Sequence, residues 1–276
     1  MRIAAAQIVT GEDPSANLDL VAEYTAQAAA AGAQLVVFPE AVQRAFGHSL
    51  KPIAEPTDGP WAQQVRNIAD QHGIAVVVGM FTPGEPTEEG KARVINTLLA
   101  TGPVPGEGAG HIEAAYQKLH LYDAFGFQES RTVQPGSAPV SFDAAELRFG
   151  LATCYDIRFP QLFQHYAREG AHATILPASW ASGPGKVEQW RVLAQARALD
   201  STQYIIACGQ ALPEAAGVEA PEGAPTGVGH SMIIAPTGEI LAEAGEEPEL
   251  LVADLDEETV RKARQQIPVL ANARPL

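Results

Sequence analysis

Short apolar segments alternate along this chain with longer amphipathic ones, and this alternation limits the fold more than any other feature of the sequence. Short apolar runs bounded by Gly, Pro or acidic residues are typical of strands that are buried on both faces. We predict strands at Ile3–Val9, Gln34–Phe38, Ile74–Phe81, Val94–Ala100, Ala114–Lys118, Leu147–Thr153, Thr174–Leu176, Tyr204–Cys208, Val228–Ala235, Ile240–Ala244 and Leu250–Asp254. We predict helices at Asn17–Ala31, Trp61–His72, Gln161–Arg168, Val187–Asp200 and Glu257–Gln266. The sequence therefore predicts a layered α/β protein.

The connections refine this prediction. The segment Pro236-Thr237-Gly238-Glu239 joins two predicted strands and is a strong hairpin signal, so we expect mixed rather than purely parallel sheets. Thr82–Gly90 and Thr101–Gly110 are rich in Gly and Pro and are predicted as surface loops, because strands resume promptly on each side. Nothing marks a domain boundary, so residues 1–276 are expected to form one domain.

The composition excludes several classes of protein. Hydrophobic residues make up 46% of the chain and charged residues 18%, which is enough apolar material for a sizeable core and excludes a disordered or fibrous chain. The 18 Lys and Arg against 33 Asp and Glu give a net charge of −15, which argues against a nucleic-acid binder or a polybasic membrane-surface protein. Two cysteines are too few for a disulfide scaffold. We see no secretory signal and no apolar run near the ~20 residues of a membrane span, so we expect a cytoplasmic protein.

Cys154 is the first candidate for chemistry, because it lies where an apolar strand ends and a turn begins. Reactive groups of α/β proteins often lie at such strand ends. The alternative is an inert buried cysteine, but the polar residues Tyr155, Asp156 and Arg158 that follow it weaken that interpretation. A thiol with an ordinary pKa of about 8.5 is only slightly ionised at neutral pH, so as a nucleophile it needs a base.

Glu40 and Lys118 lie at the ends of two other predicted strands and complete a set of nucleophile, carboxylate and cation. Glu40 is a candidate base, and the Lys118 ammonium could stabilise a developing oxyanion. Taken singly, each is more simply explained as a solvated surface residue. Together the three strand ends are more informative, although their spacing does not prove that they meet.

Several motifs in chain order resemble those of the nitrilase superfamily of carbon–nitrogen hydrolases. They are Phe38-Pro39-Glu40, Lys118-Leu119-His120-Leu121-Tyr122-Asp123, Phe127-Gln128-Glu129-Ser130, Cys154-Tyr155-Asp156-Ile157-Arg158-Phe159-Pro160, Ala178-Ser179-Trp180, Gln195–Asp200, Gly229–Met232 and Pro236–Gly238. The resemblance covers essentially the whole chain and is nearest to the branch that contains omega-amidases and deaminated-glutathione amidases. It implies an αββα sandwich with mixed sheets that pairs with a second subunit, and a Glu–Lys–Cys catalytic set.

The resemblance also implies a role for each matching residue. Glu40 would take the thiol proton as Cys154 attacks an amide carbonyl, and Lys118 with the backbone N–H of Tyr155 would hold the oxyanion. Glu40 would then donate the proton to the leaving nitrogen and activate the water that cleaves the thioester. Glu129 matches the second glutamate of the family, which orients the lysine and keeps it charged.

Two aromatic positions are predicted to shape a substrate pocket. Trp180 matches an aromatic residue of the family's pocket wall, with a plain core tryptophan as the alternative. Phe46 stands where relatives often have Tyr, so this chain lacks a hydroxyl group there.

Three further residues are open to a functional or a structural interpretation. Arg158 could bind a substrate carboxylate, but we favour a structural ion pair with Asp156. His120 is predicted to be a packed, supporting residue rather than a proton carrier. Cys208, within an apolar strand, is predicted to be structural.

The sequence favours a cofactor-free cysteine amidohydrolase that releases ammonia from a small linear carboxamide, such as an omega-amide of a dicarboxylic acid. No metal site is expected, because the histidines and cysteines lack ligand spacing. An N-carbamoyl amidohydrolase is the nearest alternative, since it would use the same residues. A catalytically silent binding subunit and a papain-like enzyme are more distant alternatives. An anionic substrate would need a locally positive pocket mouth in this acidic protein, for which Lys118, Arg131 and Arg158 are candidates.

Overall fold

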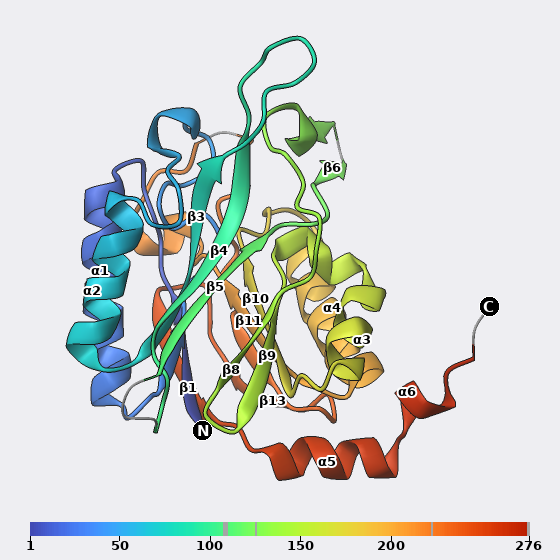
Figure 1. The fold of residues 1–276 in the computed structure, drawn as a ribbon. Helices are drawn as coiled ribbons and strands as arrows, with labels where there is room; N and C mark the ends of the chain where they lie inside the picture. The colour runs from blue at the N-terminus through green and yellow to red at the C-terminus, as the bar shows by residue number, and fades with distance from the viewer. Residues whose placement is uncertain (107–109, 125, 222, 275–276) are drawn as a thin grey trace.

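Two six-stranded mixed sheets lie face to face at the centre of the protein, and a helix pair covers the outer face of each (Figure 1). The computed structural model describes residues 1–106, 110–124, 126–221 and 223–274. The first sheet has the order β14 (Glu249–Asp254), β1 (Arg2–Gln7), β2 (Leu35–Val37), β3 (Ala75–Pro83), β4 (Val94–Pro103), β5 (His111–Gln117). The second has the order β13 (Ile240–Glu243), β12 (Met232–Ile234), β11 (Tyr204–Gly209), β10 (Ala173–Ala178), β9 (Leu147–Leu151), β8 (Ser141–Ala144).

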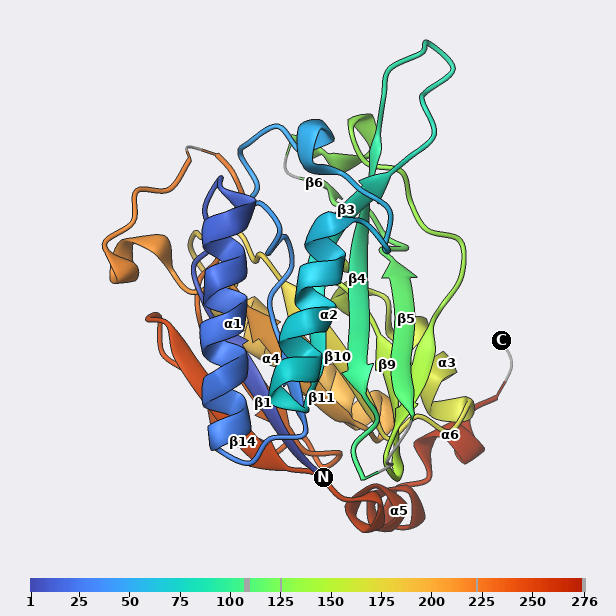
Figure 2. The same ribbon diagram turned by 60° about the vertical axis from the view of Figure 1, so that its left-hand side comes forward.

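The helices form the outer layers. Figure 2 shows α1 (Pro14–Ala30) and α2 (Pro60–His72) side by side on the first sheet, while α3 (Pro160–Arg168) and α4 (Lys186–Ser201) cover the second sheet (Figure 1). The remaining elements are β6 (Asp123–Ala124), β7 (Phe127–Gln128), the 3₁₀ turns η1 (Lys51–Ile53), η2 (Glu129–Arg131), η3 (Cys154–Arg158) and η4 (Pro213–Ala216), and the C-terminal helices α5 (Glu257–Gln266) and α6 (Val269–Asn272). The layer order is α, β, β, α, which confirms the predicted sandwich with mixed sheets.

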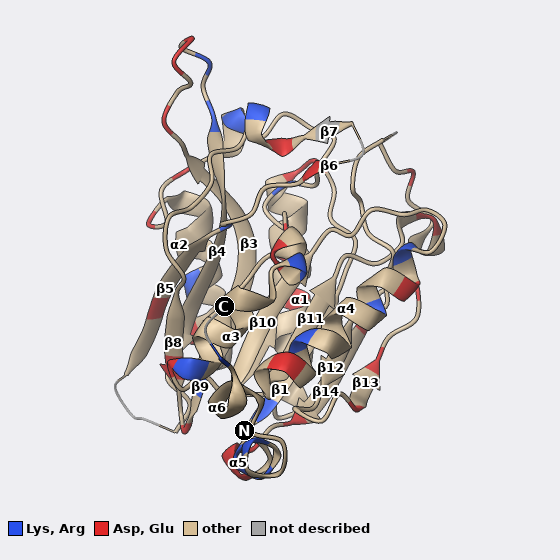
Figure 3. Cartoon of the chain, turned by 90° about the vertical axis from the view of Figure 1, so that its right-hand side faces the viewer, with Lys and Arg blue, Asp and Glu red and all other residues tan. Residues whose placement is uncertain are grey.

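The central strands are apolar on both faces because the middle of each sheet is covered on both sides. In β1, Ile3 and Ala5 point into the core between the two sheets, while Ala4 and Ala6 point into the core beneath α1 and α2. The second sheet likewise shares the central core and contributes to a separate core beneath α3 and α4. Figure 3 shows the charged residues along the outer helices and loops, and none on the ribbons of β10 and β11. Continuous apolar runs are therefore the pattern that this packing requires.

Helix ends agree with the predictions to within a few residues. We predicted that the first helix begins at Asn17, but it begins at Pro14, because the Asp13 carboxylate caps the N–H of Ser15 at 2.9 Å and proline suits the first turn. The second helix ends at His72, and the next residue, Gly73, has a φ of 68°, the left-handed conformation typical of a helix C-cap. Pro160 starts α3, one residue before the predicted start at Gln161.

Several strand predictions need correction. The segment predicted as a strand at Val228–Ala235 is extended in the sheet only over Met232–Ile234, because Gly229 and His230 have φ values of 71° and 53°. The loop predicted from Thr101 begins later, since β4 continues to Pro103, and residues 107–109 of that predicted loop lie outside the described part of the chain. The edge strand β8 was not predicted. The hairpin at residues 236–239 is confirmed by the antiparallel pairing of β12 with β13.

None of the helices in the described ranges is long and apolar enough to cross a membrane.

The parallel strands of each sheet determine where polar side chains gather. These strands are β1, β2 and β3 in the first sheet and β9, β10 and β11 in the second. Glu40 follows β2, Cys154 follows β9, and Ser179 follows β10. Because the carboxyl ends of parallel strands lie at one edge of a sheet, sandwich packing brings these residues together.

Candidate active site

Cys154 is presented by a tight turn at the end of β9. Its φ of 46° lies in the left-handed region, which a residue with a side chain adopts only at a cost of roughly 1–2 kcal/mol. The turn is held by Asp156, whose carboxylate accepts the N–H of Thr153 at 2.8 Å. The Cys154 Sγ lies 3.9 Å from the backbone oxygen of Ser179. A strained turn at this point places the partly buried Cys154 in the wall of a pocket.

Glu40 lies on a turn that packs directly on β3. The neighbouring Ala41 has a φ of 59°, and a Cβ atom at Gly79 would lie only 2.6 Å from the Ala41 nitrogen, so glycine is needed for this close approach. The Glu40 side chain is buried. Its Oε1 accepts from Asn96 Nδ2 at 2.7 Å, and its Oε2 accepts from the N–H of Ser179 at 2.8 Å. The carboxylate is thus fixed by groups from both sheets.

Lys118 joins two carboxylates immediately after β5. Its Nζ lies 3.1 Å from Glu40 Oε1 and 3.1 and 3.0 Å from the two oxygens of Glu129. Glu129 also accepts the N–H of Tyr122 at 2.7 Å. The three charged side chains are buried, so this is a hydrogen-bonded cluster with two negative charges and one positive charge.

The surroundings favour a neutral thiol and a charged ammonium. Burial raises the pKa of the Cys154 thiol well above its ordinary value, and the nearby Glu40 carboxylate raises it further. Burial alone would lower the pKa of Lys118, but the negative charges of Glu129 and Glu40 raise it well above its ordinary value. The proton on Cys154 must therefore move to a base when the sulfur attacks.

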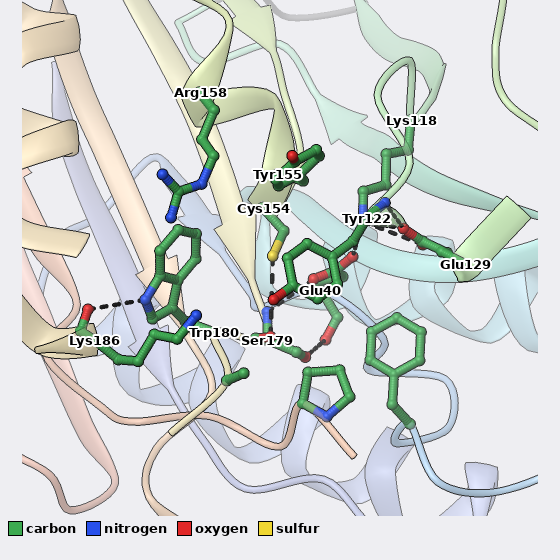
Figure 4. A pocket seen from close by; sticks show the side chains of 13 residues that line it. Glu40, Lys118, Tyr122, Glu129, Cys154, Tyr155, Arg158, Ser179, Trp180 and Lys186 are labelled. Carbon is green, nitrogen blue, oxygen red and sulfur yellow. Dashed lines mark hydrogen bonds and ion pairs between the residues drawn. The ribbon is translucent and has the colours of Figure 1, made fainter. Parts of the chain in front are cut away.

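One pocket, with an empty volume of about 490 Å³ including its open mouth, is lined by all eight residues predicted for catalysis and substrate binding (Figure 4). These are Glu40, Phe46, Lys118, Glu129, Cys154, Tyr155, Arg158 and Trp180. We call the buried group Glu40, Lys118 and Glu129, with Cys154, the floor of the pocket. We call the half-buried group Phe46, Tyr122, Arg158, Lys186 and Pro225 its rim.

The structure contradicts the predicted ion pair between Arg158 and Asp156. The buried Asp156 carboxylate accepts from the Tyr116 hydroxyl at 2.7 Å and from the backbone N–H of His120 at 3.0 Å, and it lies 2.7 Å from His120 Nδ1. The His120 ring stacks on Phe159 with ring centroids 3.6 Å apart, as expected for a packed, supporting histidine. Asp156 therefore has its own buried partners and ties the Cys154 turn to the segment after β5.

Arg158 instead lies on the pocket wall. Its guanidinium donates to Gln189 Oε1 at 2.9 Å and lies 5.6 Å from the centre of the Trp180 ring, a distance suited to a cation–π contact. Trp180 in turn donates its indole N–H to the Lys186 carbonyl at 2.9 Å. Arg131, proposed as a cation of the mouth, does not line this pocket.

Sequence reasoning missed several residues of the site. Tyr122 and Ser179 stand inside motifs that we had identified, so their neighbours were a usable signal. Lys186 is the first residue of α4 and Pro225 lies in a loop, and neither belongs to a recognisable local motif. Asn96 is a single buried amide in an apolar strand, which is a signal that could have been recognised.

Within the described residues, no group of three or more His, Cys, Asp and Glu side chains is arranged to hold a metal ion. What the floor does offer is a sulfur nucleophile, a carboxylate base and a fixed cation around one buried point. This combination suits acyl transfer through a covalent bond to sulfur.

Comparisons with known proteins agree with this chemistry. The family model described as carbon-nitrogen hydrolase matches residues 2–265. The chain is 55% identical to Hydrolase Rv0480c of Mycobacterium tuberculosis, over 99% of this chain and 95% of the relative. It is 36% identical to a deaminated glutathione amidase of Escherichia coli (99% and 97% covered) and 31% identical to the human omega-amidase NIT2 (99% and 95% covered).

Solved structures show the same fold. Nit3 of Saccharomyces cerevisiae, a member of branch 10 of the nitrilase superfamily, superposes with a TM-score of 0.79 at 29% identity, covering 98% of this chain and 94% of that one. A Glu-to-Gln mutant of an amidase from Nesterenkonia sp. AN1 has a TM-score of 0.78 at 28% identity, covering 99% and 94%. That structure shows covalent addition of the acetamide moiety of fluoroacetamide at its active-site cysteine.

Proposed function

The chain belongs to the carbon–nitrogen hydrolase family, and we propose that it hydrolyses a small linear carboxamide to a carboxylate and ammonia through a thioester on Cys154. The observation that carries this proposal is the geometry of the floor, where Lys118 Nζ lies 3.1 Å from Glu40 and the Cys154 thiol lies beside the same carboxylate. The amidase names of several relatives support the reaction class.

The first step forms the thioester. The S–H bond of Cys154 breaks, its proton passes to Glu40, and the sulfur electron pair forms a bond to the amide carbon. The carbonyl electron pair moves onto oxygen, where Lys118 and the backbone N–H of Tyr155 are the proposed donors. The tetrahedral intermediate then collapses as Glu40 returns the proton to nitrogen, so that ammonia leaves rather than an amide anion.

The second step removes the acyl group. Glu40, again a carboxylate, takes a proton from water as the water oxygen attacks the thioester carbon. The C–S bond then breaks, the carboxylic acid leaves, and Cys154 recovers its proton. Glu129 holds Lys118 in place throughout through two contacts of 3.0 and 3.1 Å.

The net charge of the floor stays the same during the reaction, which lowers the energetic cost of the tetrahedral intermediate in a buried site. At rest, Glu40 and Glu129 are negative, Lys118 is positive and Cys154 is neutral, so the floor carries one net negative charge. In the tetrahedral intermediate, Glu40 is neutral and the oxyanion carries the charge that Glu40 gave up. The reaction therefore moves a charge within a fixed set of dipoles and does not create one at low dielectric.

The cationic rim supports an omega-amide of a dicarboxylic acid as the substrate. Arg158 and Lys186 line the same pocket, and Figure 4 shows the Lys186 side chain extending below Trp180 toward it. In a protein with a net charge of −15, two cations at the mouth would attract the free carboxylate of such a substrate. An amide with no charge would gain nothing from them.

Replacing the sulfur tests the reaction. We expect Cys154→Ala to lower ammonia release by roughly 10³-fold or more, because no other group can form the thioester. Cys208→Ala is the matched control, since Cys208 is fully buried away from the pocket and should leave the rate unchanged. Full ammonia release by folded Cys154→Ala protein would refute the proposal. Measuring carbon dioxide in the same assay separates an amidase from an N-carbamoyl amidohydrolase.

Pairing with a second copy also remains a prediction. Val192 and Leu199 on α4 are 63% and 47% exposed, and Ile267 after α5 is 61% exposed, so these side chains are candidates for a contact with a second copy. Analytical ultracentrifugation at micromolar concentration tests it, and a sedimenting species of monomer mass would contradict it.

A further inference from the structure

Hydrogen bonds to the Glu40 carboxylate are divided unequally between its two oxygens. Oε1 accepts two of them, from Asn96 Nδ2 at 2.7 Å and from Lys118 Nζ at 3.1 Å. Oε2 accepts one, from the N–H of Ser179 at 2.8 Å. Because each carboxylate oxygen has two lone pairs, Oε1 is fully occupied while Oε2 keeps one lone pair free.

Asn96 supplies the shortest of these bonds from a fully buried position in β4. Its other polar atom, Oδ1, is buried and has no hydrogen-bond partner in the described part of the chain. An unpaired buried carbonyl is costly, so this amide is not explained by its contribution to stability. Turning the amide over would not help, since it would direct Oδ1 at the negatively charged carboxylate. The donor side of Asn96 is therefore fixed on Glu40.

The backbone of Asn96 also helps to position Lys118. Its carbonyl accepts the N–H of Lys118 at 2.9 Å, where β5 has just ended. One residue of β4 thus contacts the backbone of the cation and the side chain of the carboxylate. The relative position of Glu40 and Lys118 depends on it.

We propose that Asn96 is a positioning residue that, together with Lys118, occupies Oε1 of Glu40 and so makes Oε2 the oxygen that takes the Cys154 proton. This inference rests on the proposed function. In the acylation step, the S–H bond breaks and its proton goes to the free lone pair of Oε2, while the sulfur pair forms the C–S bond. The donors at Oε1 hold the carboxylate in one orientation until the substrate arrives.

The charged and titratable groups that face Glu40 come from several elements. Lys118 follows β5, Glu129 in η2 acts through Lys118, and Cys154 opens η3. Ser179, after β10, contributes only a backbone N–H. Asn96 is neutral, so replacing it with an apolar residue removes a hydrogen bond without changing the charge of the site.

The test compares Asn96→Leu with Thr97→Val across the pH range. Thr97 is the next residue of β4, is equally buried, and bonds Thr82 Oγ1 at 2.9 Å without touching Glu40. We expect Asn96→Leu to move the acid limb of the kcat/KM profile upward by about one pH unit, since losing a hydrogen bond to a charged acceptor favours protonation. We also expect kcat to fall roughly tenfold with KM little changed. Thr97→Val should keep the wild-type limb, and an Asn96→Leu limb that coincides with the wild type would overturn the inference.

A second variant keeps the test informative if Asn96→Leu does not fold. Asn96→Asp preserves shape but places two carboxyl groups within hydrogen-bond distance, and such a pair shares one proton. We expect the variant to be active while that proton bridges the two carboxyl groups. At higher pH the proton is lost and activity should fall, so the pH profile of kcat/KM should be narrower than that of the wild type. A wild-type profile in Asn96→Asp would overturn the inference. A wild-type enzyme that releases no ammonia from any amide would instead overturn the proposed function.

Discussion

The floor and the rim of the pocket are built in different ways. The floor is buried, and the charged side chains of Glu40, Lys118 and Glu129 hold one another at 3.0–3.1 Å. The rim is half-buried and comes from loops and from the ends of η3 and α4, with neutral contacts such as the one from Arg158 to Gln189. We expect the rigid floor to determine which bond is cleaved and the less tightly held rim to determine which molecule enters the pocket. Changes to the floor should therefore affect kcat, and changes to the rim should affect KM.

Removing the cation of the floor should have the largest effect. We expect Lys118→Met to lower kcat/KM by roughly 10³-fold, because the oxyanion loses a charged donor and two buried carboxylates lose their shared partner. The same loss should destabilise the fold by about 3–5 kcal/mol in urea unfolding. Lys91→Met is the control, since the Lys91 side chain is 68% exposed and pairs with Glu89 on the surface. Near-normal turnover by Lys118→Met would show that the floor does not act as a unit.

The two thiols should differ by about a hundredfold in reactivity toward iodoacetamide. Cys154 lines the pocket, while Cys208 is fully buried and burial raises its pKa. Because the pKa of Cys154 is also raised, its alkylation rate should still be rising with pH above about 10, where an ordinary thiol with a pKa of about 8.5 has reached its plateau. Peptide mass spectrometry after timed labelling checks both points. A plateau near neutral pH would mean that the resting sulfur is already ionised.

Changing the rim should affect only the capture of substrate. We expect Arg158→Met to raise KM roughly tenfold for amides that carry a carboxylate, with kcat and the kinetics of neutral amides unchanged. Arg168→Met, at an exposed position of α3, is the matched control. Steady-state kinetics on a paired set of charged and neutral amides measures the difference. An equal effect on both sets would remove the argument for a dicarboxylic substrate.

The network around Asp156 should have the smallest effect on the reaction. Tyr116→Phe removes one donor from a buried carboxylate, so we expect a loss of about 1.5–3 kcal/mol in stability and only a few-fold loss in kcat. Tyr24→Phe on α1 is a control on the far side of the first sheet. An unchanged melting temperature in Tyr116→Phe would show that this network does not hold the Cys154 turn.

The fold could be predicted where local pattern and tertiary burial agree. The apolar runs that became β3, β10 and β11 are buried throughout, so their composition alone indicated their position. The prediction failed for the segment Val228–Ser231, which is apolar in part but has glycine and histidine backbone angles that no strand adopts. It also failed for β8, an edge strand with two exposed residues out of four, because an edge needs less apolar surface.

For the site, too, local sequence pattern predicted some features and failed for others. Motifs placed Glu40, Lys118 and Cys154 at strand ends, and the structure brings those ends to one pocket. The predicted partner of Asp156, Arg158, was wrong. Arg158 is near Asp156 in the sequence, but the side chain that bonds Asp156 is that of Tyr116, 40 positions earlier in the chain. Spacing along the sequence does not show which buried donor faces a carboxylate.

By itself, the sequence determined the layers of this protein and the kinds of chemical group available at the ends of its strands. Apolar periodicity reports burial, and burial decides which segments become strands and where polar residues must leave the core. Only the tertiary structure decided which groups touch, since the bond from Ser179 to Glu40 spans 139 positions and joins two different sheets. Such contacts depend on how the sheets stack and how tightly the Glu40 turn packs on Gly79, and no local stretch of sequence carries that information.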